Sequence, residues 1–333
     1  MADVDISGLV ELLPWQASQW QDIQSRVAAG SLPHALLLRG PEGLGKAHFA
    51  HYLGLSLLCH DRGADGAPCG HCRGCELNRA GTHPDLLHVR VEPEKKEIRV
   101  EQIRDLIAVL ALKPQYGQYK IVIITPADAL NHNAANSLLK TLEEPPPGTL
   151  LLLCSSQPAR LPATIRSRCQ QLSLQRPDPV LVQSWLLKHL PANENPEILL
   201  NMAGGAPFRA LQIAQQGLSQ SREELLQGLE QLVSGQANPS KIAEDWLKLG
   251  AKESLYWLYS WIVDMIRLAA ATEPALIANP DIRKRLVAMA DNNDNRRLFH
   301  HLDKTCQGLK LLDQPLNQQL MLEDILIGWC KKS

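Results

Sequence analysis

The sequence lacks an excess of charge of either sign and contains few aromatic residues. Its 34 Lys and Arg residues balance 35 Asp and Glu residues, so the formal net charge is -1, and Phe, Trp and Tyr together make up 5% of the chain. This composition excludes a uniformly basic surface that would draw the whole protein to nucleic acid. Contacts with DNA would therefore have to come from a local patch or from partner proteins.

Long apolar runs are also missing. A membrane-spanning helix needs about 20 apolar residues, whereas the longest candidate, residues 262–271, is short and contains Asp264 and Arg267. The first residues do not combine a basic segment with an apolar core, as secretory signals do. We therefore expect no membrane partner and a cytoplasmic location. There, the eight cysteines should be reduced or metal-bound rather than paired in disulfides.

The first half of the chain alternates apolar runs with helical patterns. We expect strands at residues 36–39, 86–90, 121–125, 150–154 and 170–174, and helices at residues 46–58, 100–110 and 133–144. Strands and helices that alternate in this way predict a parallel sheet covered by helices.

After residue 175 the strand patterns stop and helical patterns continue to the end of the chain. Asp178 followed by Pro179 predicts a helix start. The sequence Ser221-Arg222-Glu223-Glu224 is typical of a capping box, which predicts another helix start at Ser221. The fold class is thus α/β followed by all-α. We predict an α/β domain over residues 1–175, a small helical domain over 176–212 and a larger helical domain over 213–333.

A glycine-rich motif follows the first expected strand. Gly40, Gly45 and Lys46 have the spacing of a loop whose backbone amides and lysine hold nucleotide phosphates. The next residue should be Ser or Thr, because its hydroxyl ligates Mg²⁺, but it is Ala47. Lys46 and the amides at the helix start could still hold an anion.

The magnesium site also lacks its carboxylates. An ATPase of this type carries an Asp at the end of a neighbouring strand, often followed by a Glu that activates water. Here Thr125 and Pro126 occupy those positions, and we interpret Asp128 as a turn or helix-cap residue. We therefore expect that ATP with Mg²⁺ is not hydrolysed at this loop.

Four closely spaced cysteines follow the first expected helix: Cys59, Cys69, Cys72 and Cys75. Four thiolates suit tetrahedral Zn²⁺, and a site without an open position is structural rather than catalytic. Reduced, metal-free cysteines are the alternative. A DNA-binding finger is disfavoured, because residues 60–83 contain three Arg, no Lys and no aromatic side chain on which a base could stack.

Several motifs occur together with these features in one order. They are HALLLRGPEGLGK at 34–46, AGTHPDLLHV at 80–89, AANSLLKTLEEPP at 134–146 and LPATIRSRCQ at 161–170. As a set they resemble the clamp-loader AAA+ subunits of bacterial DNA polymerase III. The resemblance implies an AAA+ domain with an inserted zinc module at residues 59–75, a helical lid and a helical collar that joins subunits. It also implies gamma/tau and delta subunits as partners, and a beta sliding clamp loaded on primed DNA by the assembled complex.

Within that family the chain resembles the non-catalytic delta-prime branch, because Ala47, Thr125 and Pro126 replace the magnesium-binding groups. An ATP-hydrolysing gamma/tau-like motor remains the alternative, and a zinc-bearing DNA-binding module is a third. Where motor subunits carry a phosphate-sensing Arg, our alignment places Phe208, with Arg209 one position later.

Arg168 matches the arginine of the family's Ser-Arg-Cys motif. The resemblance implies that Arg168 reaches into the ATP site of a neighbouring subunit, where a guanidinium can neutralise the charge on the transferred phosphoryl group. An exposed, salt-bridged arginine without a catalytic role is the alternative. The adjacent Glu143 and Glu144 are interpreted as the end of a helix rather than as catalytic carboxylates.

Overall fold

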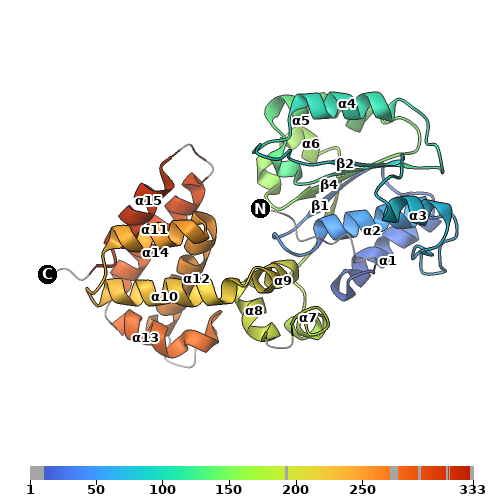
Figure 1. Cartoon of the computed structure of the whole chain (residues 1–333). Coiled ribbons are helices and arrows are strands. Elements are labelled where there is room, and N and C mark those ends of the chain that lie inside the picture. Colours follow the sequence, from blue (N-terminus) through green and yellow to red (C-terminus); the bar gives the residue numbers. More distant parts are fainter. Residues whose placement is uncertain are drawn as a thin grey trace. The chain divides into compact units, whose positions relative to one another are not determined.

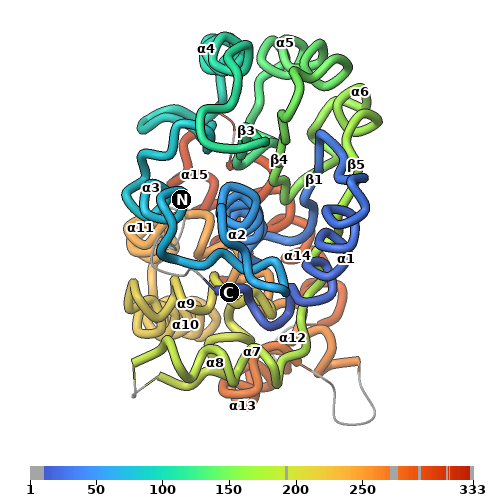
Figure 2. The backbone as a smooth tube through the Cα atoms, turned by 90° about the vertical axis from the view of Figure 1, so that its right-hand side faces the viewer, coloured from blue at the N-terminus to red at the C-terminus, as the bar shows by residue number. Residues whose placement is uncertain are grey.

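A computed structural model describes residues 11–191, 194–270, 277–291, 294–312, 314 and 316–330 (Figures 1 and 2). The chain divides into two compact units. Unit 1 contains the residues up to Trp185 together with Ala206–Arg209, and unit 2 contains Leu186–Gly205 and the residues from Ala210 onward. The predicted α/β region followed by an all-helical region is confirmed.

Unit 1 is built on a parallel five-stranded sheet. Its strands are β1 (Ala35–Arg39), β2 (Leu86–Val89), β3 (Lys120–Ile124), β4 (Thr149–Ser155) and β5 (Gln170–Ser173). Their order in the sheet is β2-β3-β4-β1-β5. Each bound lies within one residue of its prediction. The buried strands β3 and β4 are continuous apolar runs, whereas the edge strands β2 and β5 are partly exposed. The order brings the carboxyl ends of β1, β4 and β3 to the same edge, where ligands bind in open parallel sheets.

Helices cover both faces of this sheet (Figure 1). One face packs against α4 (Val100–Leu110) and α5 (His132–Glu143), and the other against α1 (Ala17–Ala28) and α2 (Lys46–Leu58). Alternate residues of a strand point to opposite faces. In β1, for example, Leu37 belongs to the first core and Leu36 to the second. Unit 1 also contains η1 (Pro14–Gln16), α3 (Arg73–Arg79), η2 (Ala127–Ala129), η3 (Pro158–Arg160), α6 (Ala163–Arg166) and most of α7 (Pro179–Leu186).

The secondary structure of the described part of unit 2 consists of helices joined by turns and loops. It contains α8 (Pro196–Met202), the end of α9 (Pro207–Gln215), α10 (Leu218–Val233), α11 (Pro239–Leu249), α12 (Ala251–Ala270), η4 (Pro280–Ile282), α13 (Arg283–Asp291), α14 (Asn295–Leu311) and α15 (Gln318–Ile327). The side chains of Trp246, Trp257 and Trp261 are almost fully buried in its core. Among the described helices, none combines the length and the apolar character needed to cross a lipid bilayer.

The two predicted helix starts had different outcomes. Asp178 caps α7, because its Oδ1 accepts a hydrogen bond from the Val180 amide at 2.9 Å. The predicted start at Ser221 is wrong, since α10 begins at Leu218 and Ser221 lies inside it. Burial of Leu225, Leu226, Leu229 and Leu232 favours a long helix over a local cap. The three-domain division stays a prediction.

Candidate functional site

The glycine-rich loop lies between the end of β1 and the start of α2. The buried Lys46 side chain turns back onto this loop, and its Nζ donates hydrogen bonds to the carbonyl oxygens of Gly40 at 2.9 Å and Pro41 at 2.7 Å. The structure thus brings Gly40, Gly45 and Lys46 together. Two of the three ammonium donors are used by the loop itself.

Side chains from distant parts of unit 1 pack on the loop. Trp15 Nε1 donates to the Leu44 carbonyl at 3.2 Å, and Gln16 Nε2 donates to the Gly45 carbonyl at 2.9 Å. A Cβ atom at Gly45 would lie only 2.6 Å from Phe208 Cε2. The side of Gly45 that faces Phe208 is therefore filled by the chain's own atoms.

An aromatic cluster extends from Phe208 (Figure 2 shows α7 and α9, which carry its C-terminal members). The Phe208 ring centroid lies 5.9 Å from that of His48 and 5.7 Å from that of Trp185, and the Trp185 ring meets Trp15 edge-on at 5.2 Å. The Phe208 amide also donates to the Gly43 carbonyl at 3.0 Å. Phe208 therefore contacts the loop through both its backbone and its ring. The assignment of Phe208 to the phosphate-sensing position stays a prediction.

The end of β3 carries no carboxylate in the positions a magnesium site needs. Thr125 follows β3 directly, and its amide is hydrogen-bonded to the Val89 carbonyl at 3.0 Å. Asp128 lies in η2, and its Oδ1 accepts a hydrogen bond from the Ser156 amide at 3.0 Å. Its place in the 3-10 turn η2 fits the turn interpretation, whereas its carboxylate orders the segment after β4.

Arg168 lies just after α6, with its side chain 34% exposed. Its Nη1 donates to the Thr164 carbonyl at 3.0 Å, and its Nη2 forms an ion pair with the Glu143 carboxylate at the end of α5. Sequence reasoning missed this pair, because Glu143 was interpreted only as a helix end. The sequence offers no signal for this contact, because the two residues are 25 positions apart and meet only where the ends of α5 and α6 come together.

The four cysteines of the cluster converge. Their Sγ atoms all lie within 4.8 Å of one another, with 3.8 Å between Cys59 and Cys72 and 4.0 Å between Cys69 and Cys75. Tetrahedral zinc with Zn–S bonds of about 2.3 Å places its sulfurs roughly 3.8 Å apart. The cluster therefore has the dimensions of a Cys₄ zinc site.

The surroundings of the cluster are also ordered. Burial raises the pKa of the Cys59 thiol and of the Cys75 thiol, so these two would need the positive charge of a metal to bind as thiolates. At Cys72 burial acts in the same direction, but hydrogen bonds within the cluster outweigh it and lower the pKa of this thiol to about 6. The two nearby histidines are engaged elsewhere: a ring nitrogen of His60 bonds to the Tyr116 carbonyl, and one of His71 to the Cys69 carbonyl, both at 2.9 Å. The four sulfurs could therefore hold one metal ion without a histidine ligand.

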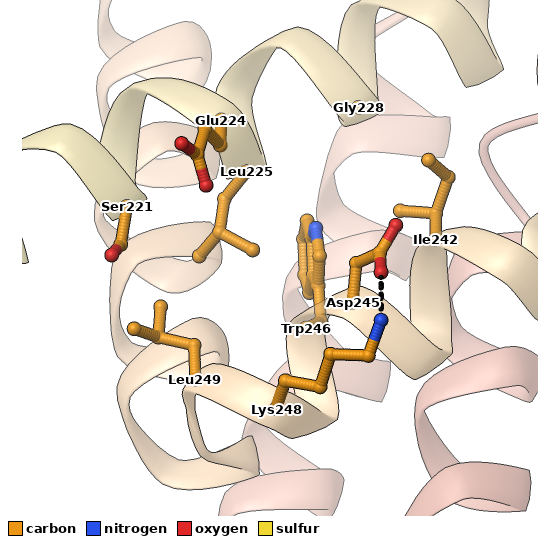
Figure 3. A pocket seen from close by; sticks show the side chains of 9 residues that line it. All are labelled: Ser221, Glu224, Leu225, Gly228, Ile242, Asp245, Trp246, Lys248 and Leu249. Carbon is orange, nitrogen blue, oxygen red and sulfur yellow. Dashed lines mark hydrogen bonds and ion pairs between the residues drawn. The ribbon is translucent and has the colours of Figure 1, made fainter.

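A separate cavity of about 550 Å³ lies in unit 2, between α10 and α11 (Figure 3). Trp246, Leu225, Leu249 and Ile242 form its apolar lining. Its charged rim includes an ion pair of 2.7 Å between Lys248 and Asp245. The lining contains no glycine-rich loop and no thiol, so we do not associate it with nucleotide or metal chemistry.

The sequence was compared with those of known proteins. It matches the families described as "DNA polymerase III, delta subunit" over residues 15–178 and "DNA polymerase III, delta subunit, C terminal" over residues 216–331. The DNA polymerase III subunit delta' of Pseudomonas aeruginosa is 36% identical over 325 residues, which cover 96% of this chain and 98% of that protein. The subunit of the same name from Escherichia coli is 32% identical, with 94% of each chain covered.

Similarity to the tau subunit is more limited. DNA polymerase III subunit tau of Escherichia coli is 36% identical over 152 residues, which cover 46% of this chain and 23% of that protein. The delta' subunits of Pseudomonas aeruginosa and Escherichia coli, in contrast, match along almost the whole length of both chains. The chain therefore belongs to the family of delta' subunits of DNA polymerase III.

Proposed function

We propose that this chain is the non-hydrolysing stator subunit of a DNA polymerase III clamp loader. In such a complex it would assemble with gamma/tau ATPase subunits and a delta subunit. The complex would place a beta sliding clamp on primed DNA in the cytoplasm. Membership in the delta' family supports this role.

The observation that carries the proposal is the state of the nucleotide loop. The loop and Lys46 are retained, but Ala47 offers no hydroxyl, and Asp128 is bonded to the Ser156 amide instead of following β3 directly. A phosphate loop without its hydroxyl and carboxylate cannot hold Mg²⁺ as P-loop ATPases do. Phe208 packs against Gly45. This contact supports a structural role for the loop in place of a catalytic one.

Nucleotide turnover by the purified chain tests this directly. We expect no Mg²⁺-dependent ATP hydrolysis, and we expect the Ala47→Ser variant to remain inactive, because a restored hydroxyl does not supply the missing carboxylate. Steady turnover by either protein, abolished by Lys46→Met, would support the motor alternative. A gamma/tau subunit assayed in parallel is the positive control.

We also propose that Arg168 acts in the ATP site of a neighbouring subunit. Its guanidinium is partly exposed and is held at the surface by Thr164 and Glu143. A planar guanidinium in that position can stabilise the charge that develops on the phosphoryl group of a neighbour's ATP. The chain's contribution to hydrolysis would then be made outside its own loop.

Finally, we propose that Cys59, Cys69, Cys72 and Cys75 bind one structural Zn²⁺. The sulfur separations support this assignment. Two hydrogen bonds tie the intervening segment to unit 1: Trp20 Nε1 donates to the Asp65 carbonyl at 2.9 Å, and Ser56 Oγ donates to the Gly66 carbonyl at 2.6 Å. The metal would close a small lobe against α1 and α2, without taking part in catalysis.

A further inference from the structure

The carboxylate of Glu143 lies against the guanidinium of Arg168, although the two residues are 25 positions apart. Glu143 is the last residue of α5, and Arg168 follows the end of α6. The second anchor of the guanidinium is the Thr164 carbonyl of α6, 3.0 Å from Nη1. Arg168 is therefore held at two points by two different helices.

We infer that Glu143 is a positioning residue that fixes Arg168 in the orientation it needs to reach a neighbouring nucleotide. This inference rests on the proposed role of Arg168. A guanidinium has five N–H donors, of which Glu143 and Thr164 each accept one, so three remain for phosphate oxygens. An arginine that is already oriented loses less conformational freedom when it binds the phosphoryl group.

The alternative is a surface ion pair that serves only to stabilise the fold. The Glu143 side chain is 50% exposed and that of Arg168 is 34% exposed, and ion pairs with this exposure contribute little to folding stability. Removal of Glu143 should therefore leave unit 1 folded. Any effect on ATP turnover would then report on the placement of Arg168, to which catalysis is sensitive at the level of about 1 Å.

Glu144 provides a matched control. It is the next residue, it is exposed, and its backbone amide bonds to the Lys140 carbonyl at 2.9 Å as the helix ends. Within the described residues its carboxylate has no ion pair. Glu144→Ala removes the same charge from the same helix end and leaves the Arg168 contact in place.

The experiment measures kcat and KM for ATP with the reconstituted loader, in the presence of clamp and primed DNA. Arg168→Ala sets the scale, because it removes the guanidinium. We expect Glu143→Ala to lower kcat by at least half as much as Arg168→Ala does, with KM unchanged. Glu143→Gln should have a kcat close to that of the wild type, since Gln keeps an acceptor oxygen. In the Arg168→Ala background, Glu143→Ala should add nothing, and Glu144→Ala should have no effect in either background.

Two results would overturn the inference. Glu143→Ala could leave kcat unchanged while Arg168→Ala lowers it, or it could lower kcat equally with and without Arg168, which would indicate a structural effect. If Arg168→Ala itself leaves turnover unchanged, the proposed role of Arg168 fails first. Thermal unfolding of each purified variant shows whether a loss of turnover comes from unfolding.

Discussion

At the scale of single residues, Gly45 shows how the glycine-rich loop is held in shape by the side chains packed on it. Its backbone lies in the left-handed region, with φ of 83°, and its position is closed by Phe208, Leu13 and Gln16. These contacts join the loop to the N-terminal 3-10 helix and to the start of α9. Loss of the loop's shape would therefore disturb the packing of unit 1, whether or not a phosphate binds there.

This packing predicts that Gly45→Ala destabilises the protein. The new Cβ would meet Phe208 Cε2 at 2.6 Å and Leu13 Cδ1 at 2.9 Å, in a backbone conformation that side chains disfavour. We expect the free energy of unfolding to fall by about 2–4 kcal/mol, from strain and overpacking together. Urea unfolding measures it.

Gly30→Ala is the control for Gly45→Ala. Gly30 also has a positive φ, of 63°, but a Cβ there would have no atom within 4 Å. The free energy of unfolding of Gly30→Ala should fall only by the cost of a side chain in the left-handed backbone region, about 1 kcal/mol. Equal losses in the two variants would contradict the packing of Phe208 on the loop.

His301 predicts a dependence of stability on pH. Its ring is buried and stacks on Trp329 at 4.2 Å, and within the described residues neither ring nitrogen has a hydrogen-bond partner. Burial, with the nearby Arg297, His300 and Lys304, lowers the pKa of His301 from 6.5 to about 4. In the folded protein His301 is therefore neutral at pH values where the unfolded chain binds a proton.

Because the unfolded state binds more protons between pH 6.5 and pH 4, the free energy of unfolding should fall as the pH falls through that range. The contribution of His301 should be about 3 kcal/mol. Urea unfolding at several pH values gives the free energy of unfolding of the wild type and of His301→Phe. The contribution of His301 is the difference between the two slopes of that free energy against pH. The exposed His132 lies in unit 1, and His132→Ala serves as the control. Parallel curves for wild type and His301→Phe would contradict the assignment.

Single residues also mark the limit of what the sequence predicts. Gly40, Gly45, Lys46 and the substitution at Ala47 could be identified because their chemistry depends on spacing along the chain. The partner of Arg168 could not, since the contact with Glu143 depends on where the ends of α5 and α6 meet. The packing of Phe208 on Gly45 likewise joins residues 163 positions apart.

At the scale of elements, the strands of unit 1 were predictable and the start of α10 was not. A buried strand is an uninterrupted apolar run, so β1 and β4 are visible in the sequence. The capping pattern at Ser221 is local, and the burial of the leucines on α10 outweighs it. Helix boundaries in an all-helical region depend on such tertiary packing, which the sequence alone does not show.

The cysteine lobe predicts a local, metal-dependent element. We expect elemental analysis to find one zinc ion per chain in the purified wild-type protein. Cys75→Ser removes a buried ligand, and this variant should contain no zinc. Because metal binding and local folding are linked, amide exchange should increase in residues 59–79, while the strands of the sheet keep their protection. Cys306→Ser, outside the cluster, should retain full zinc content.

Two results would contradict the zinc assignment. The wild-type chain could contain no zinc after purification without chelators, or Cys75→Ser could keep the same content. Increased exchange throughout the sheet would show instead that the lobe supports the whole of unit 1.

At the scale of the whole molecule, we propose different roles for two parts of unit 1, the glycine-rich loop and Arg168. The loop is held by hydrogen bonds from Lys46 to the carbonyl oxygens of Gly40 and Pro41, and Phe208 packs on it at Gly45. The Arg168 side chain is 34% exposed, and its proposed role would bring it to the ATP site of another chain. A delta' family member of this kind would assist hydrolysis in an assembly without carrying it out.

The most direct test compares Arg168→Ala and Lys46→Met in the reconstituted loader. Lys46→Met keeps much of the buried aliphatic chain but removes the ammonium, and thermal unfolding confirms that each variant is folded. We predict that Arg168→Ala lowers ATP turnover and that Lys46→Met leaves it at the wild-type rate. A loss with Lys46→Met and wild-type turnover with Arg168→Ala would show that the chain hydrolyses ATP itself.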